Sequence, residues 1–488
     1  MVIESLKYKI LQQFGFAPTQ EQGQALDTFV SFLTDRDPQA VMILRGSAGT
    51  GKTSLSGAIV RTLLQIRQKV MLLAPTGRAA KVFSLGSGAP AYTIHRRIYR
   101  EKAFAGVDGQ FGLNDNLYTD TLFMVDEASM IANMGLGGTT FGSGCLLDDL
   151  VKFVYQGHND RLLLIGDKAQ LPPVGEEESP ALSASVMEGY GLKVYECDLN
   201  EVLRQSQSSG ILYNATLIRQ MITHDAVTGL PLIRFKGFAD IVMMPGAELV
   251  ESLGDSYHHV GMDETMVITR SNKRANIYNN GIRNMVLDRE EELSSGDMLM
   301  IVKNNYFWTE KEKKESGEGS AGAVPAFLAN GDRAKVLRVS NYIELYGLRF
   351  ATLLLQLPDY DDYEMQVTGM LDTLQSEAPA LTHEQQEELF RQVEEDYQHF
   401  VPLKADRMKS IRQDTYFNAL QIKYAYAVTC HKAQGGQWAH VYVDQGYMTD
   451  DMLTPDYIHW LYTAFTRATD KLFLVNWPKE QTCEPTDL

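Results

Sequence analysis

One stretch restricts the fold of this chain more than any other: an apolar run, residues 41–44, that leads into a glycine-rich turn and a helix. The pattern G-x-x-x-x-G-K-[ST] is complete from Gly46 to Thr53. Glycines allow a tight turn whose N–H groups point at a polyphosphate, and the helix adds its positive N-terminal end. Lys52 would reach the β- and γ-phosphates, and the Thr53 hydroxyl would hold Mg²⁺. The predicted ATP-binding residues of this loop are Gly46, Ser47, Ala48, Gly49, Thr50, Gly51, Lys52 and Thr53.

Two later apolar runs also end in polar turns. Residues 122–125 lead directly into Asp126 and Glu127. One carboxylate can hold Mg²⁺ while the next activates the attacking water. Residues 162–165 lead into a turn that contains Gln170 and two prolines. Gln170 either orients the attacking water or belongs to an ordinary loop stiffened by the prolines.

Four other polar residues have weaker signals. Thr19 and Gln22 have the spacing of a capping box, which would begin a helix that runs to about residue 32. Gln22 could instead recognise adenine, because an amide both donates and accepts hydrogen bonds. Arg204 and Arg467 are either surface residues or arginines that reach the γ-phosphate from another domain, which can accelerate hydrolysis by about 10³–10⁵-fold.

The composition indicates a soluble globular protein, with 44% apolar and 22% charged residues. No run of 18 apolar residues exists, so no transmembrane helix is expected. Residues 1–16 lack the apolar segment of a secretion signal. The four cysteines lie far apart without a C-x-x-C pair, which argues against a zinc site or a disulfide framework and favours the cytoplasm.

The negative charge of the chain is concentrated in one region. The net charge is −17, but 13 acidic and 3 basic residues between Asp359 and Arg407 account for −10 of it and leave −7 elsewhere. A nucleic-acid partner would therefore need a shaped groove rather than a basic tail. The acidic residues at 359, 361, 362 and 364 are better explained as a solvated surface than as a metal site, because no histidine or further ligand completes a pattern.

Apolar runs that alternate with helical stretches predict an α/β fold with parallel sheets, whose site lies at the C-terminal ends of the strands. In the first half, after the phosphate loop, the expected strands are residues 70–74, 122–125, 162–165 and 194–197. A second such sheet is expected from residues 266–269, 298–302, 334–339, 424–429, 440–443 and 472–475.

Three segments look inserted into this alternation. Residues 101–118 contain Asp108-Gly109, which is typical of a hairpin tip. Residues 133–144 form a glycine-rich loop, and residues 309–323 read as a solvated, mobile loop. The acidic region includes a predicted helix from Thr382 to about Phe400.

With these motifs in order, the chain resembles superfamily 1 helicases of the 5′-to-3′ group, which includes the RecD and phage Dda helicases. The resemblance runs from Thr19 to Val475. The Gln-Leu-Pro-Pro-Val form of residues 170–174 is similar to this group rather than to the 3′-to-5′ group. Motifs Q, I, Ia, Ib, II, III, IV, V and VI correspond to residues 19–22, 46–53, 74–80, 93–95, 125–129, 166–174, 203–205, 428–435 and 462–468.

The resemblance implies two RecA-like domains with ATP in the cleft between them and DNA across both. Mg²⁺ would be held by Thr53 and Asp126, and Gln22 would join the ATP-binding residues. The implied catalytic residues, the last two as arginine fingers, are Lys52, Asp126, Glu127, Gln170, Arg204 and Arg467. The implied single-stranded DNA contacts are Pro75, Thr76, Arg78, His95, Thr429, His431 and Lys432.

The family pattern also implies domain boundaries. We expect an N-terminal helix in residues 1–16, the first RecA-like domain in 17–205 and the second in 206–488. A strand-separating pin hairpin is expected at about residues 99–120, with Phe104 or Phe111 either at the wedge or merely anchoring the hairpin. An SH3-like accessory insertion is expected at about residues 340–416, where the acidic helix departs from a plain SH3-like fold.

The function that the resemblance implies is an ATP-dependent DNA helicase and translocase that moves 5′ to 3′ and acts as a monomer at duplex junctions. DNA repair and recombination are the implied processes, with replication, repair or nuclease proteins as partners. Two alternatives stay open: an RNA helicase, because the motif sets overlap, and a helicase subunit of an exonuclease complex. A scaffold that only binds ATP is disfavoured by the intact Lys52, Asp126, Glu127, Gln170 and Arg467.

Overall fold

The computed structural model describes residues 2–105, 108–135, 142–201, 208–223, 229–316, 324–325 and 327–483. The chain divides into two compact units. The first unit comprises Met1–Phe104, Asp108–Gly246 and Ala433–Leu488, and the second comprises Ala105–Val107 and Ala247–Lys432. Residues 206–246 and 433–488 thus belong to the first unit, whereas the expected domain boundary placed them in the second domain. Within the described ranges, no helix is long and apolar enough to cross a membrane.

A six-stranded sheet forms the centre of the first unit, with the order β3-β2-β6-β7-β1-β8. All five pairs of neighbouring strands in this sheet are parallel. The predicted α/β class is confirmed, as are the four strands expected after the phosphate loop. The bounds are β1 Ala40–Gly46, β2 Lys69–Ala74, β3 Ala91–Thr93, β6 Thr121–Val125, β7 Arg161–Gly166 and β8 Lys193–Leu199.

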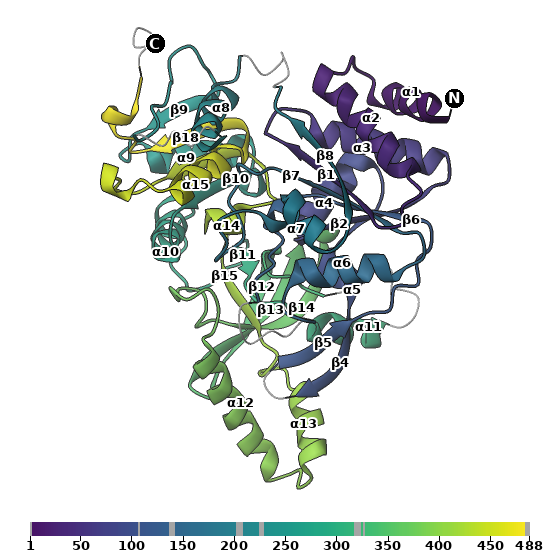
Figure 1. The fold of residues 1–488 in the computed structure, drawn as a ribbon. Coiled ribbons are helices and arrows are strands. Elements are labelled where there is room, and N and C mark those ends of the chain that lie inside the picture. Colours follow the sequence, from purple (N-terminus) through teal and green to yellow (C-terminus); the bar gives the residue numbers. More distant parts are fainter. Residues whose placement is uncertain are drawn as a thin grey trace. The chain divides into compact units, whose positions relative to one another are not determined.

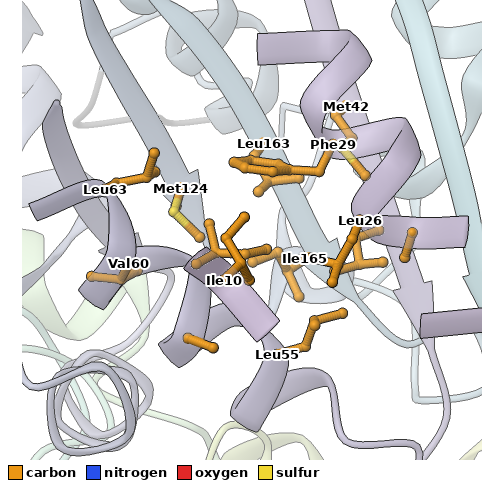
Figure 2. Close-up of a cluster of buried hydrophobic side chains, with 14 of the residues drawn as sticks. Ile10, Leu26, Phe29, Met42, Leu55, Val60, Leu63, Met124, Leu163 and Ile165 are labelled. Carbon is orange, nitrogen blue, oxygen red and sulfur yellow. The ribbon is translucent and has the colours of Figure 1, made fainter. Parts of the chain in front are cut away.

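Both faces of this sheet are covered, because β1, β6 and β7 are buried along their whole length. Successive residues of β1 alternate between two cores: Met42 and Leu44 join one, and Val41 and Ile43 join the other. Figure 2 shows the first of these cores, where side chains from α1, α2 and α3 meet those of the sheet. These helices are α1 Val2–Phe14, which lies within the range expected for the N-terminal helix, α2 Gln20–Thr34 and α3 Lys52–Gln65.

The other helices that accompany the six-stranded sheet are short. They are α4 Gly77–Ser87, α5 Ile94–Ile98, α6 Leu146–Gln156 and α7 Ala184–Gly189. The hairpin expected near residues 99–120 is present as two paired strands, β4 Tyr99–Ala105 and β5 Asp108–Leu113. Asp108 and Gly109 lie in β5 rather than at the tip, so the prediction of the turn position was wrong.

A second set of strands in the first unit also pairs in parallel. Strand β17 pairs with β18, and β18 pairs with β9. Helices α8 and α15 pack against each other in the same unit. The bounds are α8 Gly210–Thr223, β9 Ile241–Met244, α15 Pro455–Phe465, β17 Trp438–Asp444 and β18 Ala468–Val475.

The second unit contains a closed β-barrel of β11 to β15. Its bounds are β11 Met298–Ile301, β12 Arg333–Leu345, β13 Leu348–Leu357, β14 Tyr363–Met370 and β15 Leu420–Tyr424. Between β14 and β15 the chain forms two helices that lie side by side (Figure 1). The unit's other elements are α9 Leu249–His259, β10 Thr265–Thr269, α10 Asn272–Gly281, α11 Phe307–Ser316, α12 His383–Gln398, α13 Lys404–Arg412, β16 Ala427–Thr429 and α14 Cys430–Ala433. The last residue of α14, Ala433, belongs to the first unit.

The barrel corrects three expectations. Residues 298–302 and 334–339 were expected in a second parallel sheet, but β11 and β12 pair antiparallel in the barrel. The run 424–429 is divided between β15 of the barrel and β16, which pairs in parallel with β10. The accessory region expected at 340–416 is larger, because barrel strands extend from Met298 to Tyr424.

Two expected loops have different outcomes. Residues 309–316 lie in α11 rather than in a loop, and residues 317–323 lie outside the described part of the chain. In the glycine-rich segment 133–144, the backbone N–H groups of Asn133 and Met134 donate to Glu176, and residues 136–141 are not described. The predicted helix from Thr382 is confirmed as α12, with Thr382 as its N-cap.

Candidate active site

The phosphate loop has the strand–turn–helix form that its sequence predicts. Strand β1 ends at Gly46, and α3 begins at Lys52. Gly49 and Gly51 have φ values of 76° and 80°, in the left-handed region that favours glycine. A Cβ atom on Gly46 would lie 2.7 Å from Cγ of Lys52, so this position also requires glycine.

Lys52 is held inside the loop that it follows. Its Nζ donates to the carbonyl oxygens of Gly46, at 2.5 Å, and of Ser47, at 3.1 Å. The ammonium group therefore occupies the concave side of the loop, where phosphate oxygens would replace these carbonyls as partners.

Gln22 braces the loop from α2. Its side-chain Oε1 accepts from the N–H of Thr19, and its Nε2 donates to the backbone carbonyl oxygen of Thr50 at 2.9 Å. The side chain is 1% exposed, and the capping box is complete. The capping interpretation is confirmed, and adenine recognition by Gln22 stays a prediction.

Asp126 and Glu127 follow β6, beside the ends of β2 and β7 in the sheet. The N–H of Asp126 donates to Leu73 of β2 at 3.0 Å, and its Oδ1 accepts from the N–H of Glu127 at 2.9 Å. Burial and the Glu127 carboxylate raise the pKa of Asp126 to about 7, partly offset by Lys52. A partly buried negative charge that Lys52 does not fully compensate suits a divalent cation, and carboxylate and hydroxyl oxygens are the ligands that Mg²⁺ prefers.

The turn after β7 carries Gln170, which is 6% exposed. Its N–H donates to Asp167 at 3.3 Å. Its Oε1 is buried and has no hydrogen-bond partner within the described part of the chain. Such an atom costs free energy unless a water or ligand completes it, which favours the catalytic interpretation of Gln170 over an ordinary loop.

Helix α15 contacts this turn through one face. His459 Nδ1 lies 2.9 Å from the carbonyl oxygen of Ala169, and Thr463 Oγ1 accepts from the N–H of Leu171 at 2.8 Å. Gln434 adds a third contact, since its Nε2 donates to the carbonyl oxygen of Leu171 at 2.7 Å. None of the three was predicted as a site residue, although Gln434 and Thr463 lie in motifs V and VI. His459 and Thr463 stand four positions apart, as residues on one helix face do.

Tyr462, the neighbour of Thr463, reaches the phosphate loop itself. Its hydroxyl donates to Asp167 Oδ2 at 2.6 Å and accepts from the N–H of Ala48 at 3.0 Å. Burial and the Asp167 carboxylate raise the pKa of Tyr462, so the hydroxyl keeps its proton. One side chain thus joins motif VI, motif III and the phosphate loop.

Arg219 of α8 is the other unforeseen residue at the loop. Its guanidinium donates to the hydroxyl of Ser47. It lines a pocket of about 270 Å³ together with Gly46, Ser47, Asp167 and His459. No sequence pattern indicates this contact, which joins residues 172 positions apart.

The structure describes only one of the two predicted arginine fingers. Arg204 lies outside the described residues. Arg467 is 2% exposed, and its guanidinium donates to the carbonyl oxygens of Thr463 and Gly436 and to the Thr466 hydroxyl. A γ-phosphate contact by Arg467 stays a prediction that requires these bonds to exchange.

The predicted DNA contacts are divided between the two units. In the first unit, Thr76 caps α4 by accepting from the N–H of Ala79, and Pro75 precedes it. Arg78 donates to the Gln437 carbonyl at 2.7 Å and stacks on the Trp438 ring at 4.5 Å. His95 lies in α5, and burial lowers its pKa to about 4, so the ring is neutral at pH 7.

The second unit holds Thr429, His431 and Lys432, at the end of β16 and in α14. Lys432 Nζ donates to the side chain of Asn330. Burial and the nearby Lys423 lower the pKa of Lys432 to about 8. The nearby Lys423 makes the charged form of Lys432 more costly, and a bound phosphate would offset that cost.

The two candidate pin residues lie on different strands of the hairpin. Phe111 of β5 packs against the second hydrophobic core, which favours an anchoring role. Phe104 lies in β4, and its side chain is outside the described part of the structure.

Two family models match the chain. Residues 17–229 match an AAA domain, and residues 424–475 match the UvrD-like helicase C-terminal domain. These ranges contain the phosphate loop, motif III and α15.

Three relatives are similar in sequence. Uncharacterized protein R530 of Acanthamoeba polyphaga mimivirus is 21% identical over 90% of this chain and 96% of its own length. The ATP-dependent RecD2 DNA helicase of Deinococcus radiodurans is 30% identical over 32% of this chain and 18% of its own length. Uncharacterized protein MJ1519 of Methanocaldococcus jannaschii is 33% identical over 32% of this chain and 13% of its own length. The chain thus spans less than a fifth of the length of two of these relatives.

Among solved structures, Pif1 helicase from Bacteroides in complex with ADP-AlF3 and ssDNA has a TM-score of 0.46 and 13% identity, over 96% of this chain and 95% of that one. Pif1 helicase from Candida albicans has a TM-score of 0.40 and 17% identity, over 96% of this chain and 97% of that one. Together with the motifs in their expected order, the two family models and the RecD2 relative support a superfamily 1 helicase of the RecD type.

Proposed function

We propose that this protein is an ATP-dependent DNA helicase and translocase that moves 5′ to 3′ on single-stranded DNA and unwinds duplexes. The observation that carries the proposal is the position of Tyr462, which bonds at once to the phosphate loop and to Asp167. A change at the γ-phosphate can therefore reach both motif III and α15 through one side chain. The sequence relationship to a RecD2 DNA helicase supports the choice of DNA over RNA.

In the proposed reaction, the loop N–H groups and Lys52 bind the phosphates of ATP. Thr53 and Asp126 would hold Mg²⁺, which neutralises charge on the phosphates and on the transition state. Glu127 activates the attacking water, and Gln170 orients it through its unpaired Oε1. Lys52 is required for phosphate binding, because it supplies the cation that already lies within the phosphate loop.

The proposed DNA track uses Pro75, Thr76, Arg78 and His95 of the first unit and Thr429, His431 and Lys432 of the second. Contacts to phosphates and stacked bases tolerate any sequence, as a translocase requires. A duplex junction would be parted at the β4–β5 hairpin. We propose that the protein acts as a monomer, with repair, recombination or replication proteins as partners.

Polarity and chemistry are tested together with forked substrates. The experiment measures unwinding of duplexes that carry a 5′ or a 3′ single-stranded tail, with ATP, Mg²⁺ and either wild type or Lys52→Ala. We expect unwinding of the 5′-tailed duplex alone, and its loss in Lys52→Ala because the phosphate-binding cation is gone. Preferential unwinding of the 3′-tailed duplex would refute the polarity, and unwinding that survives Lys52→Ala would refute the assigned ATP site.

A further inference from the structure

Arg219 is a partly buried cation at the edge of the phosphate loop. It lies in the last turns of α8, and its guanidinium donates to the Ser47 hydroxyl. Among the residues that the structure describes, no carboxylate forms an ion pair with it. Arg45, which lines the same pocket, differs, because Asp198 and Glu196 pair with it at 2.6 and 2.8 Å.

The charge of Arg219 therefore needs a partner of another kind. A guanidinium presents a planar fork of donors that matches two oxygens of a phosphate, and one neutral hydroxyl uses little of that capacity. Its one described hydrogen-bond acceptor, Ser47, is the second residue of the loop, directly before Ala48.

The contacts of Ala48, the residue after Ser47, also place Arg219 beside the phosphate-binding part of the loop. The Ala48 N–H donates to the Tyr462 hydroxyl, while Arg219 contacts the preceding residue, Ser47, so the two side chains reach adjacent positions of the loop. Arg219, Tyr462 and Lys52 thus surround the first half of the loop, while Arg467 is committed to backbone carbonyls. Of these arginines, Arg219 is the one whose contacts leave it oriented toward the loop.

We propose that Arg219 is a catalytic residue that binds the γ-phosphate of ATP. This inference rests on the proposed ATPase function. Arg219 would exchange the Ser47 hydroxyl for γ-phosphate oxygens when ATP binds. As water adds to the γ-phosphorus and the bond to the β–γ bridging oxygen breaks, giving ADP and phosphate, the guanidinium stabilises the charge on the transferred group. The alternative is that Arg219 only braces Ser47 and so shapes the empty loop.

The two roles differ in how they treat ADP, which lacks the γ-phosphate. The experiment measures the affinities of AMP-PNP and ADP, both with Mg²⁺, by calorimetry, and the kcat of DNA-stimulated ATP hydrolysis. The variants are Arg219→Ala and Arg219→Lys, and the matched control is Gln220→Ala, at the exposed next position of α8.

For Arg219→Ala we expect AMP-PNP affinity to fall about tenfold or more, ADP affinity to stay within about twofold, and kcat to fall about 10²-fold or more. Arg219→Lys should retain part of both, because it keeps the charge but not the fork. Gln220→Ala should match wild type. Unchanged ADP affinity also shows that the variant site is folded.

Three results would overturn the inference. Equal losses for AMP-PNP and ADP would mean that Arg219 only braces the loop. A wild-type kcat in Arg219→Ala would mean that it does not touch the transferred phosphate, while the proposed ATPase function would stand. A wild type that binds neither nucleotide would remove both proposals together.

Discussion

At the residue scale, the hydrogen bond between Thr463 and Leu171 is a direct link from α15 to motif III. Thr463 is fully buried, and its Oγ1 accepts the Leu171 N–H at 2.8 Å. Replacing Thr463 by valine keeps the shape but leaves that N–H unpaired, which costs about 1–3 kcal/mol. We expect Thr463→Val to lower the free energy of unfolding by this amount in urea denaturation, and Thr463→Ser, which keeps the hydroxyl, to lose less. Equal losses in the two variants would mean that the hydrogen bond contributes nothing.

The charge state of Lys432 makes a second prediction at this scale. Its pKa is lowered to about 8 by burial and by Lys423, so the side chain is mostly charged at pH 7 and mostly neutral at pH 9. If Lys432 binds a DNA phosphate, affinity for labelled single-stranded DNA should fall between these pH values, by up to about tenfold in fluorescence anisotropy. Lys432→Arg should flatten this dependence, because a guanidinium stays charged. The same pH profile in both proteins would exclude Lys432 from the DNA contact.

At the element scale, α2 and α12 provide a matched pair of capping boxes. Thr19 begins α2 in the first unit, and Thr382 begins α12 in the second. Each threonine-to-alanine change should cost about 1 kcal/mol of stability, because one N–H loses its cap. Thr19→Ala alone should also raise the KM for ATP, since its partner Gln22 holds the Thr50 carbonyl. Calorimetric unfolding and steady-state kinetics of both variants test this, and a KM change in Thr382→Ala would contradict it.

Elements whose signal is local could be predicted from the sequence. The phosphate loop depends on glycines at fixed spacing, and two of them have the positive φ values that the turn requires. The capping box of α2, from Thr19 to Gln22, lies within four residues. Asp126 and Glu127 could be placed because a buried parallel strand reads as a continuous apolar run and ends at the site.

Features set by distant pairing could not be predicted. The run 298–302 has the same apolar pattern in a parallel sheet as in a barrel, and only its antiparallel partner β12 decides between them. The contact of Arg219 with Ser47 spans 172 residues and follows from the packing of α8. Tyr462 lies in motif VI, but only the tertiary structure shows that its hydroxyl accepts from the Ala48 N–H.

At the scale of the whole molecule, the net charge of −17 limits how the protein can hold DNA. The proposed DNA-contacting residues include one arginine, Arg78, and one lysine, Lys432, that can each neutralise a phosphate. Two phosphate contacts predict a slope of about −1.4 for log affinity against log salt concentration on single-stranded DNA. Anisotropy titrations over a range of NaCl concentrations give this slope. A value steeper than about −3 would require further basic residues in the DNA track.

The described parts of the nucleotide site lie within the first unit, whereas the proposed DNA contacts are divided between both units. A DNA motor with this arrangement requires DNA binding to control ATP hydrolysis at the phosphate loop. Coupling of this kind is a free energy shared between two sites, and it appears as a change in hydrolysis when DNA is added.

The most direct test of the account is the rate of ATP hydrolysis with and without single-stranded DNA. We predict a slow basal rate that rises about tenfold or more with saturating DNA, by the coupling just described, and no DNA-stimulated hydrolysis in Lys52→Ala. Hydrolysis that DNA leaves unchanged, or that persists in Lys52→Ala, would contradict the claim that this chain is an ATP-driven DNA motor.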